Sequence, residues 1–405
     1  MDFLNVKGKV NVDSAITNFQ FRSYKSYTTG ELNHNDECRL VIQQQDLITI
    51  PGLSELRIQG KLLKYDESGV STKVQLINNF IAFLFEEIRY ELGGITIDRV
   101  INPGITTSMK GYVSYTPSES TALMFASWVP FDNENINNAA TGEFDVCYPL
   151  SSILGFAEDF KKIIVNCRQE LVLRRTADDL NATIEKTGLE KGKITNLKIT
   201  WSIPHTTVSD YEKLKLLETT EKNIPLEIAY RRWELFRYPQ LPETHSFTWV
   251  LKSSTFLEKP RFVIFGFQTD RNNNLTKDAS KFDHCNLKNI KLYLNSQSYP
   301  YENLNLNFRN SKYALAYSMY ARFQQSYYNK QICEPLLDPF KYKSTAPLIV
   351  IDCSYQNDTI KQGTVDARLE FETISDVPAN TSAFCLVLHE QFVEYEPLTG
   401  VVKKV

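Results

Sequence analysis

The stretch Ile88-Arg-Tyr-Glu-Leu-Gly-Gly94 is echoed by Ile290-Lys-Leu-Tyr-Leu-Asn-Ser296, at an offset of 202 residues, about half the chain length. A second pair keeps the same order. Glu55-Leu-Arg-Ile-Gln-Gly60 resembles Pro260-Arg-Phe-Val-Ile-Phe-Gly266, and aligning the two glycines gives an offset of 206 residues. Self-similarity at a long, nearly fixed period is typical of a repeated structural unit. The two pairs predict that the chain contains the same fold twice.

Two further pairs keep nearly the same spacing. Pro149-Leu150 recurs as Pro347-Leu348 at an offset of 198 residues, and Glu170-Leu-Val-Leu-Arg-Arg175 recurs as Asp366-Ala-Arg-Leu-Glu-Phe371 at an offset of 196. Each match alone is weak, because apolar strands resemble one another, but four matches in one order indicate a duplication. Each half then has roughly 190 residues and seven or eight strands, which fits a jelly roll with moderate loops.

Length and composition agree with two folded halves. The chain has 405 residues, whereas a single hydrophobic core usually stops growing at roughly 250 to 300 residues. It is 42% hydrophobic and 23% charged, with 24 Phe and 21 Tyr. This composition lies in the range of globular proteins, and the aromatic and β-branched content favours pleated sheets over helix bundles.

Short apolar or alternating runs bounded by Gly, Pro and Asn recur along the whole chain and predict strands. In the first half these runs are Ile16–Tyr24, Arg39–Ile50, Leu56–Lys64, Ile88–Val100, Lys162–Leu173 and Ile194–Ile203. In the second half they are Ile224–Phe236, Ser246–Leu251, Arg261–Phe267, Ile290–Leu294, Leu348–Cys353, Val365–Phe371 and Ala383–Tyr395. So many short strands predict an all-β protein made of sandwiches or barrels.

Only two stretches have a convincing helical pattern. The first begins at Ser209, which forms a capping box with Glu212, and it stops before Pro225. Because it lies at mid-chain, we expect it to connect the two halves. The second begins after Asn310 and has a stripe of aromatic and small residues at helical spacing, which predicts a helix packed over a sheet edge or sandwich end. The stripe is Tyr313, Ala316, Tyr317, Tyr320, Phe323 and Tyr327.

Charge, leader and cysteine patterns narrow the function classes. The net charge is -3 and the basic residues are spread along the chain, which disfavours strong direct binding of nucleic acid. The N-terminus lacks an apolar leader, and the longest apolar runs, Phe80–Phe85 and Ala383–Leu388, are too short for a membrane span. The seven cysteines favour reduced, buried thiols over a disulfide framework, because they are widely spaced and odd in number. They are Cys38, Cys147, Cys167, Cys285, Cys333, Cys353 and Cys385.

The sequence does not predict a metal site. A jelly roll can be a cupin enzyme when His and carboxylate ligands converge inside its barrel. Here the histidines are isolated singles, without a pair at ligand spacing, and the nearest approach to a cluster is Asp283-His284-Cys285. Adjacent strand residues point to opposite faces, so surface or satisfied histidines fit better, and we expect no metal and no cofactor. The five are His34, His205, His245, His284 and His389.

Other catalytic patterns are equally weak. The pairs Glu86-Glu87 and Asp178-Asp179 are adjacent residues, so solvated or turn carboxylates are the better interpretation than an acid and a base on one face. No phosphate-binding glycine loop or nucleophile elbow is present. The aromatic and basic segment Tyr230-Arg-Arg-Trp-Glu-Leu-Phe-Arg-Tyr238 is better read as a strand with mixed faces than as a base-stacking platform. We therefore expect no catalytic residue and no enzyme activity.

Several segments resemble one known family. Phe144-Asp-Val-Cys-Tyr-Pro-Leu, running on to Cys167-Arg-Gln-Glu-Leu-Val-Leu-Arg-Arg175, is similar to the first jelly roll of double jelly-roll major capsid proteins of Polinton-like and adintovirus-like DNA viruses, whether exogenous or endogenised. Trp201-Ser-Ile-Pro-His205 resembles their inter-domain passage. Lys259–Gln268, Phe282–Asn286 and Leu292–Pro300 resemble their second jelly roll. The resemblance runs from about Asn79 to the C-terminus and rests on strand and turn signatures, so no reactive residue carries over.

The resemblance implies a non-enzymatic shell subunit. Its expected partners are two further copies in a homotrimer, neighbouring capsomers, and minor or penton capsid proteins. Six jelly rolls would then form a pseudo-hexagonal capsomer of an icosahedral capsid, assembled inside the host cell. Closed cyclic symmetry would satisfy such interfaces, and neighbours would cover the free sheet edges.

Two tandem eight-stranded jelly rolls with a few short helices are thus the expected fold. The expected division is residues 1–205, with about 15 residues as an N-terminal arm, a helical linker over 206–224, and residues 225–405. A competing function is a carbohydrate-binding tandem sandwich, since lectins share this architecture. It requires an exposed aromatic platform, for which Tyr299, Tyr301, Tyr327 and Tyr328 are candidates.

Overall fold

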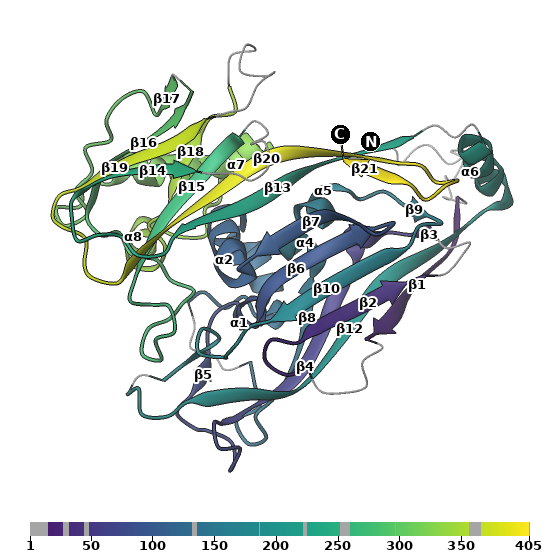
Figure 1. Ribbon diagram of the computed structural model, residues 1–405, viewed down its shortest axis with the longest axis horizontal. Coiled ribbons are helices and arrows are strands. Elements are labelled where there is room, and N and C mark those ends of the chain that lie inside the picture. Colours follow the sequence, from purple (N-terminus) through teal and green to yellow (C-terminus); the bar gives the residue numbers. More distant parts are fainter. Residues whose placement is uncertain are drawn as a thin grey trace, which may run out of the picture.

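The protein is described by a computed structural model that covers residues 15–26, 32–43, 48–131, 136–185, 187–221, 225–251, 260–295, 297–355 and 366–404. Figure 1 shows two β-sandwiches side by side, with long strands reaching from one along the other. The expected N-terminal arm and residues 222–224 of the expected linker lie outside the described residues.

The first half of the chain forms a sandwich of two antiparallel sheets. One sheet has the order β8 (Glu143–Pro149), β4 (Glu55–Lys64), β12 (Gly192–Val208), β3 (Ile48–Thr49) and β9 (Ile164–Val165), and β1 (Ile16–Lys25) also pairs with β12. The facing sheet has the order β2 (Glu37–Ile42), β10 (Gln169–Arg175), β6 (Phe85–Leu92) and β7 (Ile95–Ile101). A small separate ladder joins β5 (Gln75–Leu76) to β11 (Thr183–Ile184).

The second half repeats this arrangement. Its first sheet has the order β13 (Leu226–Tyr238), β20 (Thr381–Tyr395), β15 (Pro260–Thr269) and β18 (Ile349–Asp352), with β21 (Val402–Lys404) also on β20. Its facing sheet has the order β14 (Ser246–Leu251), β19 (Ala367–Thr373), β16 (Leu287–Leu294) and β17 (Gln297–Tyr299). Strands that are distant in sequence are neighbours in every sheet, which is the pattern of Greek-key jelly rolls.

The two sandwiches correspond strand by strand. Chain order and sheet position together match β1, β2, β4, β6, β7, β8, β10 and β12 with β13, β14, β15, β16, β17, β18, β19 and β20. Each half therefore contains one eight-stranded jelly roll. The prediction of an all-β double jelly roll with a few helices is confirmed.

The internal matches in the sequence fall on corresponding strands, but not all are in register. Gly60 pairs with Phe144, and a Cβ on Gly60 would lie 2.6 Å from the Phe144 ring. A Cβ on Gly266 would lie 2.6 Å from Leu348 in the same way, so these two glycines are equivalent. Phe144 therefore corresponds to Leu348, and the match of Pro149 with Pro347 is wrong.

The fourth match is on the correct strands and faces but is shifted. Leu173 pairs with Ile88 in the first roll, and Phe371 pairs with Ile290 in the second. Leu173 thus corresponds to Phe371, two residues away from the sequence match. An error of two residues keeps every side chain on its own face, because side chains alternate with a period of two.

Three expected strands are each interrupted. The run Ile88–Val100 is a hairpin of β6 and β7, which turns at Gly93 and Gly94, both with positive φ. The runs expected over 39–50 and 162–173 each break into one long and one two-residue strand, the short pieces being β3 and β9.

The sequence pattern located only two of the helices. The two expected ones are present as α6 (Asp210–Glu221) and α7 (Ala314–Tyr328), and Glu212 N–H donates to Ser209 Oγ at 3.4 Å. The sequence pattern missed the others, which are α1 (Phe80–Phe83), α2 (Pro103–Ser114), α3 (Pro117–Ala122), α4 (Leu150–Ile153), α5 (Gly155–Asp159), α8 (Pro339–Thr345) and the 3-10 turns η1 (Pro51–Leu53) and η2 (Met124–Ala126).

The largest of the missed helices, α2, is determined by packing. It has two glycines and few strong helix formers, so its propensity is low. A Cβ on Gly104 would overlap the Phe83 ring, and one on Gly111 would overlap Trp128. The glycines let aromatic rings cover the helix closely, and eleven of its twelve residues are buried.

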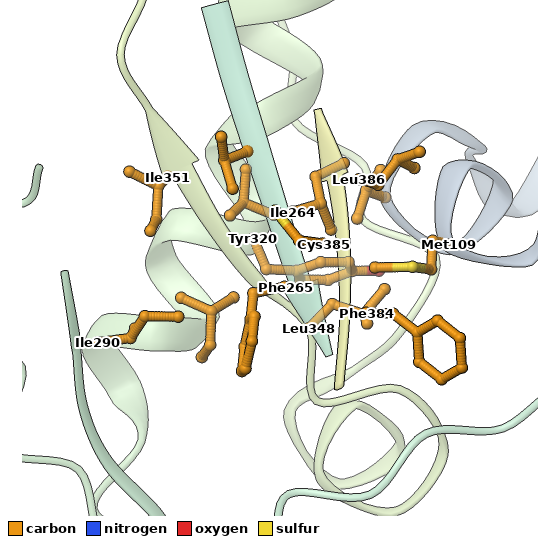
Figure 2. Packing of buried hydrophobic residues seen from close by; sticks show 14 of the residues in the cluster. Met109, Ile264, Phe265, Ile290, Tyr320, Leu348, Ile351, Phe384, Cys385 and Leu386 are labelled. Atoms are coloured by element: carbon orange, nitrogen blue, oxygen red, sulfur yellow. The ribbon is translucent and has the colours of Figure 1, made fainter. Parts of the chain in front are cut away.

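The two cores exchange side chains. Met109 and Tyr112 of α2 belong to the core of the second half, and Figure 2 shows Met109 pointing from its helix toward that cluster. In return, Tyr230 of β13 and Tyr395 of β20 belong to the core of the first half. The long strands β13 and β20 thus bury one end in each sandwich (Figure 1). The rolls are joined by side chains buried in each other's cores, which opposes their independent movement.

The connector α6 lies between β12 and β13, and β12 continues to Val208. The division of the chain at residues 205 and 225 stays a prediction. In the part of the chain that the structure describes, no helix combines the length and apolarity that crossing a bilayer requires.

Candidate functional site

The histidines lie apart from one another. His34 Nε2 is 3.2 Å from Asp179 Oδ2, His205 Nε2 is 3.0 Å from the Tyr24 hydroxyl, and His245 Nδ1 is 3.3 Å from Asp376 Oδ1. Among the described residues, no three His, Cys, Asp or Glu side chains gather in a way that would hold a metal ion.

The two remaining histidines are in the second half. His389 of β20 is buried, and its Nε2 lies 3.5 Å from Glu234 Oε2 on β13. His284 is partly buried and stacks on Phe308, with 5.0 Å between ring centroids and an interplanar angle of 1°. Asp283 and Cys285 flank His284, but Asp283 binds Arg271 through both oxygens at 2.7 Å. The segment Asp283-His284-Cys285 therefore has no converging set of ligands.

The adjacent carboxylates have different environments. Glu86 is exposed beside Arg174 at 3.3 Å, whereas Glu87 is buried between Arg89 at 3.2 Å and Arg99 at 2.7 Å. Burial acts to raise the pKa of Glu87, but the hydrogen bonds from the two arginines outweigh burial and hold that pKa below its usual range. Glu87 is therefore a structural anion within its sheet, and its interpretation as a solvated or turn carboxylate is wrong.

Asp178 and Asp179 differ in the same way. Asp178 accepts a hydrogen bond from the backbone of Leu180 at 3.0 Å, as expected for a turn. Asp179 is buried, and it accepts bonds from Arg175 at 2.6 Å and from the Ile194 backbone N–H at 2.8 Å. The interpretation of both carboxylates as turn or solvated groups is wrong for Asp179, which forms a buried ion pair.

The four candidate tyrosines do not form one exposed platform. Tyr301 is 86% exposed and Tyr299 is half-buried near it in the chain. Tyr327 is only 7% exposed, and Tyr328 donates its hydroxyl proton to Glu158 of the first half at 2.7 Å. Both rings of α7 therefore belong to the contact between the rolls and are not presented to a carbohydrate.

The cysteines form no disulfide. Cys38, Cys167, Cys353 and Cys385 are buried, Cys285 and Cys333 are partly buried, and Cys147 is exposed. The expectation of buried thiols is thus wrong for Cys147, which lies on the outer face of β8, where alternation puts every second residue in solvent.

The aromatic and basic segment of β13 has its function at the junction between the rolls. Arg231 donates to both oxygens of Asp159 of α5, at 2.8 and 2.6 Å, and to the backbone carbonyl of Tyr327 at 2.7 Å. Its guanidinium also lies over the Tyr327 ring, 3.9 Å from the centroid. Arg231 thus joins α5 of the first half to α7 of the second. The interpretation of this segment as a strand with mixed faces did not predict that contact.

A buried lysine supports the same junction. Lys110 of α2 is 1% exposed, and its ammonium donates to the Ser151 carbonyl at 2.8 Å and lies 3.0 Å from Glu158 Oε2. The same ammonium lies 5.2 Å from the ring centroid of Trp233 on β13. A buried charge is retained only with such partners, because an unpaired one is costly. The aromatic and basic run of β13 was a sequence signal for Arg231 and Trp233, but it gave none for Lys110, which is distant in the chain.

Apolar side chains are exposed where β12 turns into α6. None of the residues whose burial is described in α6 is buried, and Tyr211, Leu214 and Leu217 are 67%, 61% and 49% exposed along one stripe. The neighbouring edge strand β1 is bonded to β12, and its Phe19 and Phe21 are 44% and 53% exposed. We call Tyr211, Leu214, Leu217, Phe19 and Phe21 the α6/β1 surface.

Comparison with known families decides the relationship. Residues 74–393 match the model of the double jelly roll-like domain. The chain belongs to this family. It carries the family fold over most of its length, with both rolls inside the matched region except for β1, β2, β3, β4 and β21.

Solved structures with the same fold cover nearly the whole chain. The PBCV-1 virus capsid protein has a TM-score of 0.59 and 12% identity over 98% of both chains. The mavirus major capsid protein has a TM-score of 0.57 and 12% identity, over 99% of this chain and 92% of that one. The Faustovirus major capsid protein has a TM-score of 0.59 and 9% identity, over 95% and 92%. No curated protein sequence matches the chain.

Proposed function

We propose that this double jelly-roll protein is the major capsid subunit of a virus and acts without catalysis. The observation that carries the proposal is the duplicated roll itself, in one chain whose fold matches viral major capsid proteins nearly end to end. Its location would then be the virion capsid. Membership of the Polinton-like group and the division into residues 1–205, 206–224 and 225–405 are finer parts of the same proposal.

The duplication gives a geometric reason for assembly. Three copies of a chain with two similar rolls place six similar walls around one axis, so a trimer can occupy a six-fold position in a lattice. The buried junction between the rolls supports this function, because it keeps the two walls of one subunit in a fixed relation. We propose a homotrimer that contacts neighbouring capsomers and minor capsid proteins.

The α6/β1 surface is the part of the subunit that we propose for contact with a second copy. An isolated helix of 12 residues is marginal in water, and α6 buries none of its described side chains within its own chain. An edge strand with exposed aromatic residues is likewise normally covered. A second copy seated here would bury Leu214, Leu217 and Phe21 and would stabilise both elements.

Negative-stain electron microscopy of the purified protein tests the proposal. Class averages are expected to show three-fold particles with six lobes, and higher protein concentration is expected to produce sheets or closed shells. Single two-lobed particles under every assembly condition would contradict the capsid function.

A further inference from the structure

A pocket of about 570 Å³ opens where loops of the second roll meet. It is bounded by the segment between β15 and β16, by the segment between β17 and α7, by α8, and by the loop before β20. No part of the junction or of the α6/β1 surface lines it. The charged side chains in its wall are Arg271, Lys277, Arg309, Lys343, Asp283 and Asp376.

Two cationic side chains in the wall of this pocket have no carboxylate partner among the described residues. Arg271 binds Asp283 at 2.7 Å, and Lys277 lies 3.4 Å from Asp270. Within the described residues, neither Arg309 nor Lys343 has a carboxylate within 4.0 Å. In a chain of net charge -3, this is a local positive field that attracts anions.

His284 supplies a fixed hydrogen-bond donor beside these cations. Its Nδ1 accepts a hydrogen bond from the backbone N–H of Asn286 at 2.9 Å, so in the neutral ring Nε2 carries the proton. Burial lowers the pKa of His284, and the charges of Lys343 and Arg309 lower it further, against Asp283, which raises it. The positive charges that would attract a ligand into the pocket therefore also act on the His284 imidazole.

Asn286 supplies an unused acceptor in the same wall. The residue is 4% exposed, and its side-chain oxygen has no hydrogen-bond partner. The oxygen is enclosed by its neighbours, and a buried acceptor without a partner is costly, so a ligand hydroxyl that displaces these neighbours on binding would satisfy it. A ligand that fits the wall thus has a negative oxygen near Arg309 and Lys343 and a hydroxyl near Asn286.

We propose that this pocket binds an oxyanion that also carries a hydroxyl group, the chemistry shared by hydrogen phosphate and by sugar acids. Arg309 and Lys343 hold the negative oxygens, His284 Nε2–H donates to the ligand, and Asn286 Oδ1 accepts from its hydroxyl. The proposal stands on the second roll alone and does not depend on capsid assembly.

The test uses the full chain with histidine labelled by ¹³C at the ε1 position. The chain has five histidines, and a His284→Asn variant assigns the resonance of His284. Inorganic phosphate is expected to shift the His284 resonance saturably and to raise the pKa of His284. Sulfate, which has no hydroxyl at neutral pH, is expected to bind at least several-fold more weakly, and glucuronate shows whether a sugar acid also fits.

Three variants complete the test. The double variant R309Q/K343Q is expected to weaken phosphate binding about tenfold or more, which is about 1.4 kcal/mol per factor of ten. The control R322Q removes an exposed arginine of α7 outside the pocket and should bind phosphate like the wild type. N286G should abolish the preference for phosphate over sulfate, since glycine tolerates the positive φ of 54° at this position.

Two results would overturn the proposal. One is a His284 resonance that does not respond saturably to either phosphate or glucuronate. The other is equal phosphate binding by the wild type and R309Q/K343Q, with thermal melting showing that both are folded. Equal binding of phosphate and sulfate by the wild type would refute the hydroxyl contact with Asn286.

Discussion

At the scale of single residues, a buried ion pair ties the turn after β10 to β12. Arg175 and Asp179 have side chains that are 1% and 2% exposed, and their charged atoms are 2.6 Å apart. Burial lowers the pKa of Arg175 more than the charge of Asp179 raises it. Either partner alone would be an uncompensated buried charge.

Asp179→Ala is expected to destabilise the protein by about 3–5 kcal/mol, because it leaves Arg175 buried and unpaired. Asp178→Ala is the matched control, since it removes the adjacent, half-buried carboxyl and one turn hydrogen bond, which contributes about 1 kcal/mol. Urea unfolding of the two variants measures the difference. A cost for Asp179→Ala no larger than that of Asp178→Ala would disprove the structural role of the pair.

The lowered pKa of Glu87 predicts that the stability of the protein depends on pH. Its pKa in the folded protein is below its usual range because Arg99 and Arg89 stabilise the anion against burial. The stability from this shift is complete above the unfolded pKa of about 4.3 and is lost as the pH falls through the lower folded value. Glu87→Gln should therefore lose less stability between pH 6 and pH 3 than the wild type does. Urea midpoints at both pH values measure this, and parallel losses would contradict it.

Sequence patterns at this scale predict which face a residue occupies but not what it meets there. Alternation correctly separated Glu86 from Glu87, whereas the burial of Asp179 depends on Arg175 and on Ile194 of another strand. The pocket around His284 was also invisible, because it combines side chains from three loops that are up to about a hundred residues apart. Isolated histidines gave no signal for it.

At the scale of elements, the close approach of α5 to β13 holds the rolls together. A Cβ on Gly155 would overlap the carbonyl oxygen of Arg231, so only glycine fits between the helix and the strand. Arg231 then reaches both Asp159 and Tyr327 from this position. The hydrogen bonds of the junction thus depend on one small residue.

Gly155→Ala is expected to destabilise the junction by about 1–3 kcal/mol or more, because the clash is with backbone and overpacking forces the elements apart. Ser151→Ala in α4 adds no such clash and serves as the control. Protease digestion that reports separation of the rolls, together with thermal melting, measures the effect. Identical behaviour of the two variants would contradict the close packing.

Element prediction succeeded where periodicity was long and failed where packing decides. Strands such as β14, which spans Ser246–Leu251 as expected, end where the amino-acid composition changes clearly. Helix α2 was missed because its glycines and β-branched residues have low helix propensity, and aromatic rings of other elements stabilise it. The hairpin of β6 and β7 was missed because both strands contain apolar residues and only two glycines separate them.

At the scale of the whole molecule, the duplication was predictable because corresponding strands have the same packing requirement. Gly60 and Gly266 are each covered by a side chain of the neighbouring strand, and this shared constraint preserves the match. The match of Pro149 with Pro347 had no such cause and was wrong. The proposed viral function rests on resemblance to other proteins, since no residue pattern within the chain predicts a partner.

The α6/β1 surface gives a prediction for assembly. Leu214→Asp is expected to weaken the proposed trimer about tenfold or more, because burying a leucine contributes about 1.5–3 kcal/mol. Leu189→Asp is the control, since Leu189 is 85% exposed in a loop away from α6. Sedimentation velocity over a range of concentrations measures dissociation. Equal effects of the two substitutions would exclude α6 from the contact.

The mass of the purified protein in solution tests the central claim most directly. Sedimentation equilibrium is expected to give three times the mass of one chain, and the same protein should form six-lobed particles in the microscope. A single-chain mass at every concentration and salt condition would contradict the account of this protein as a capsid subunit.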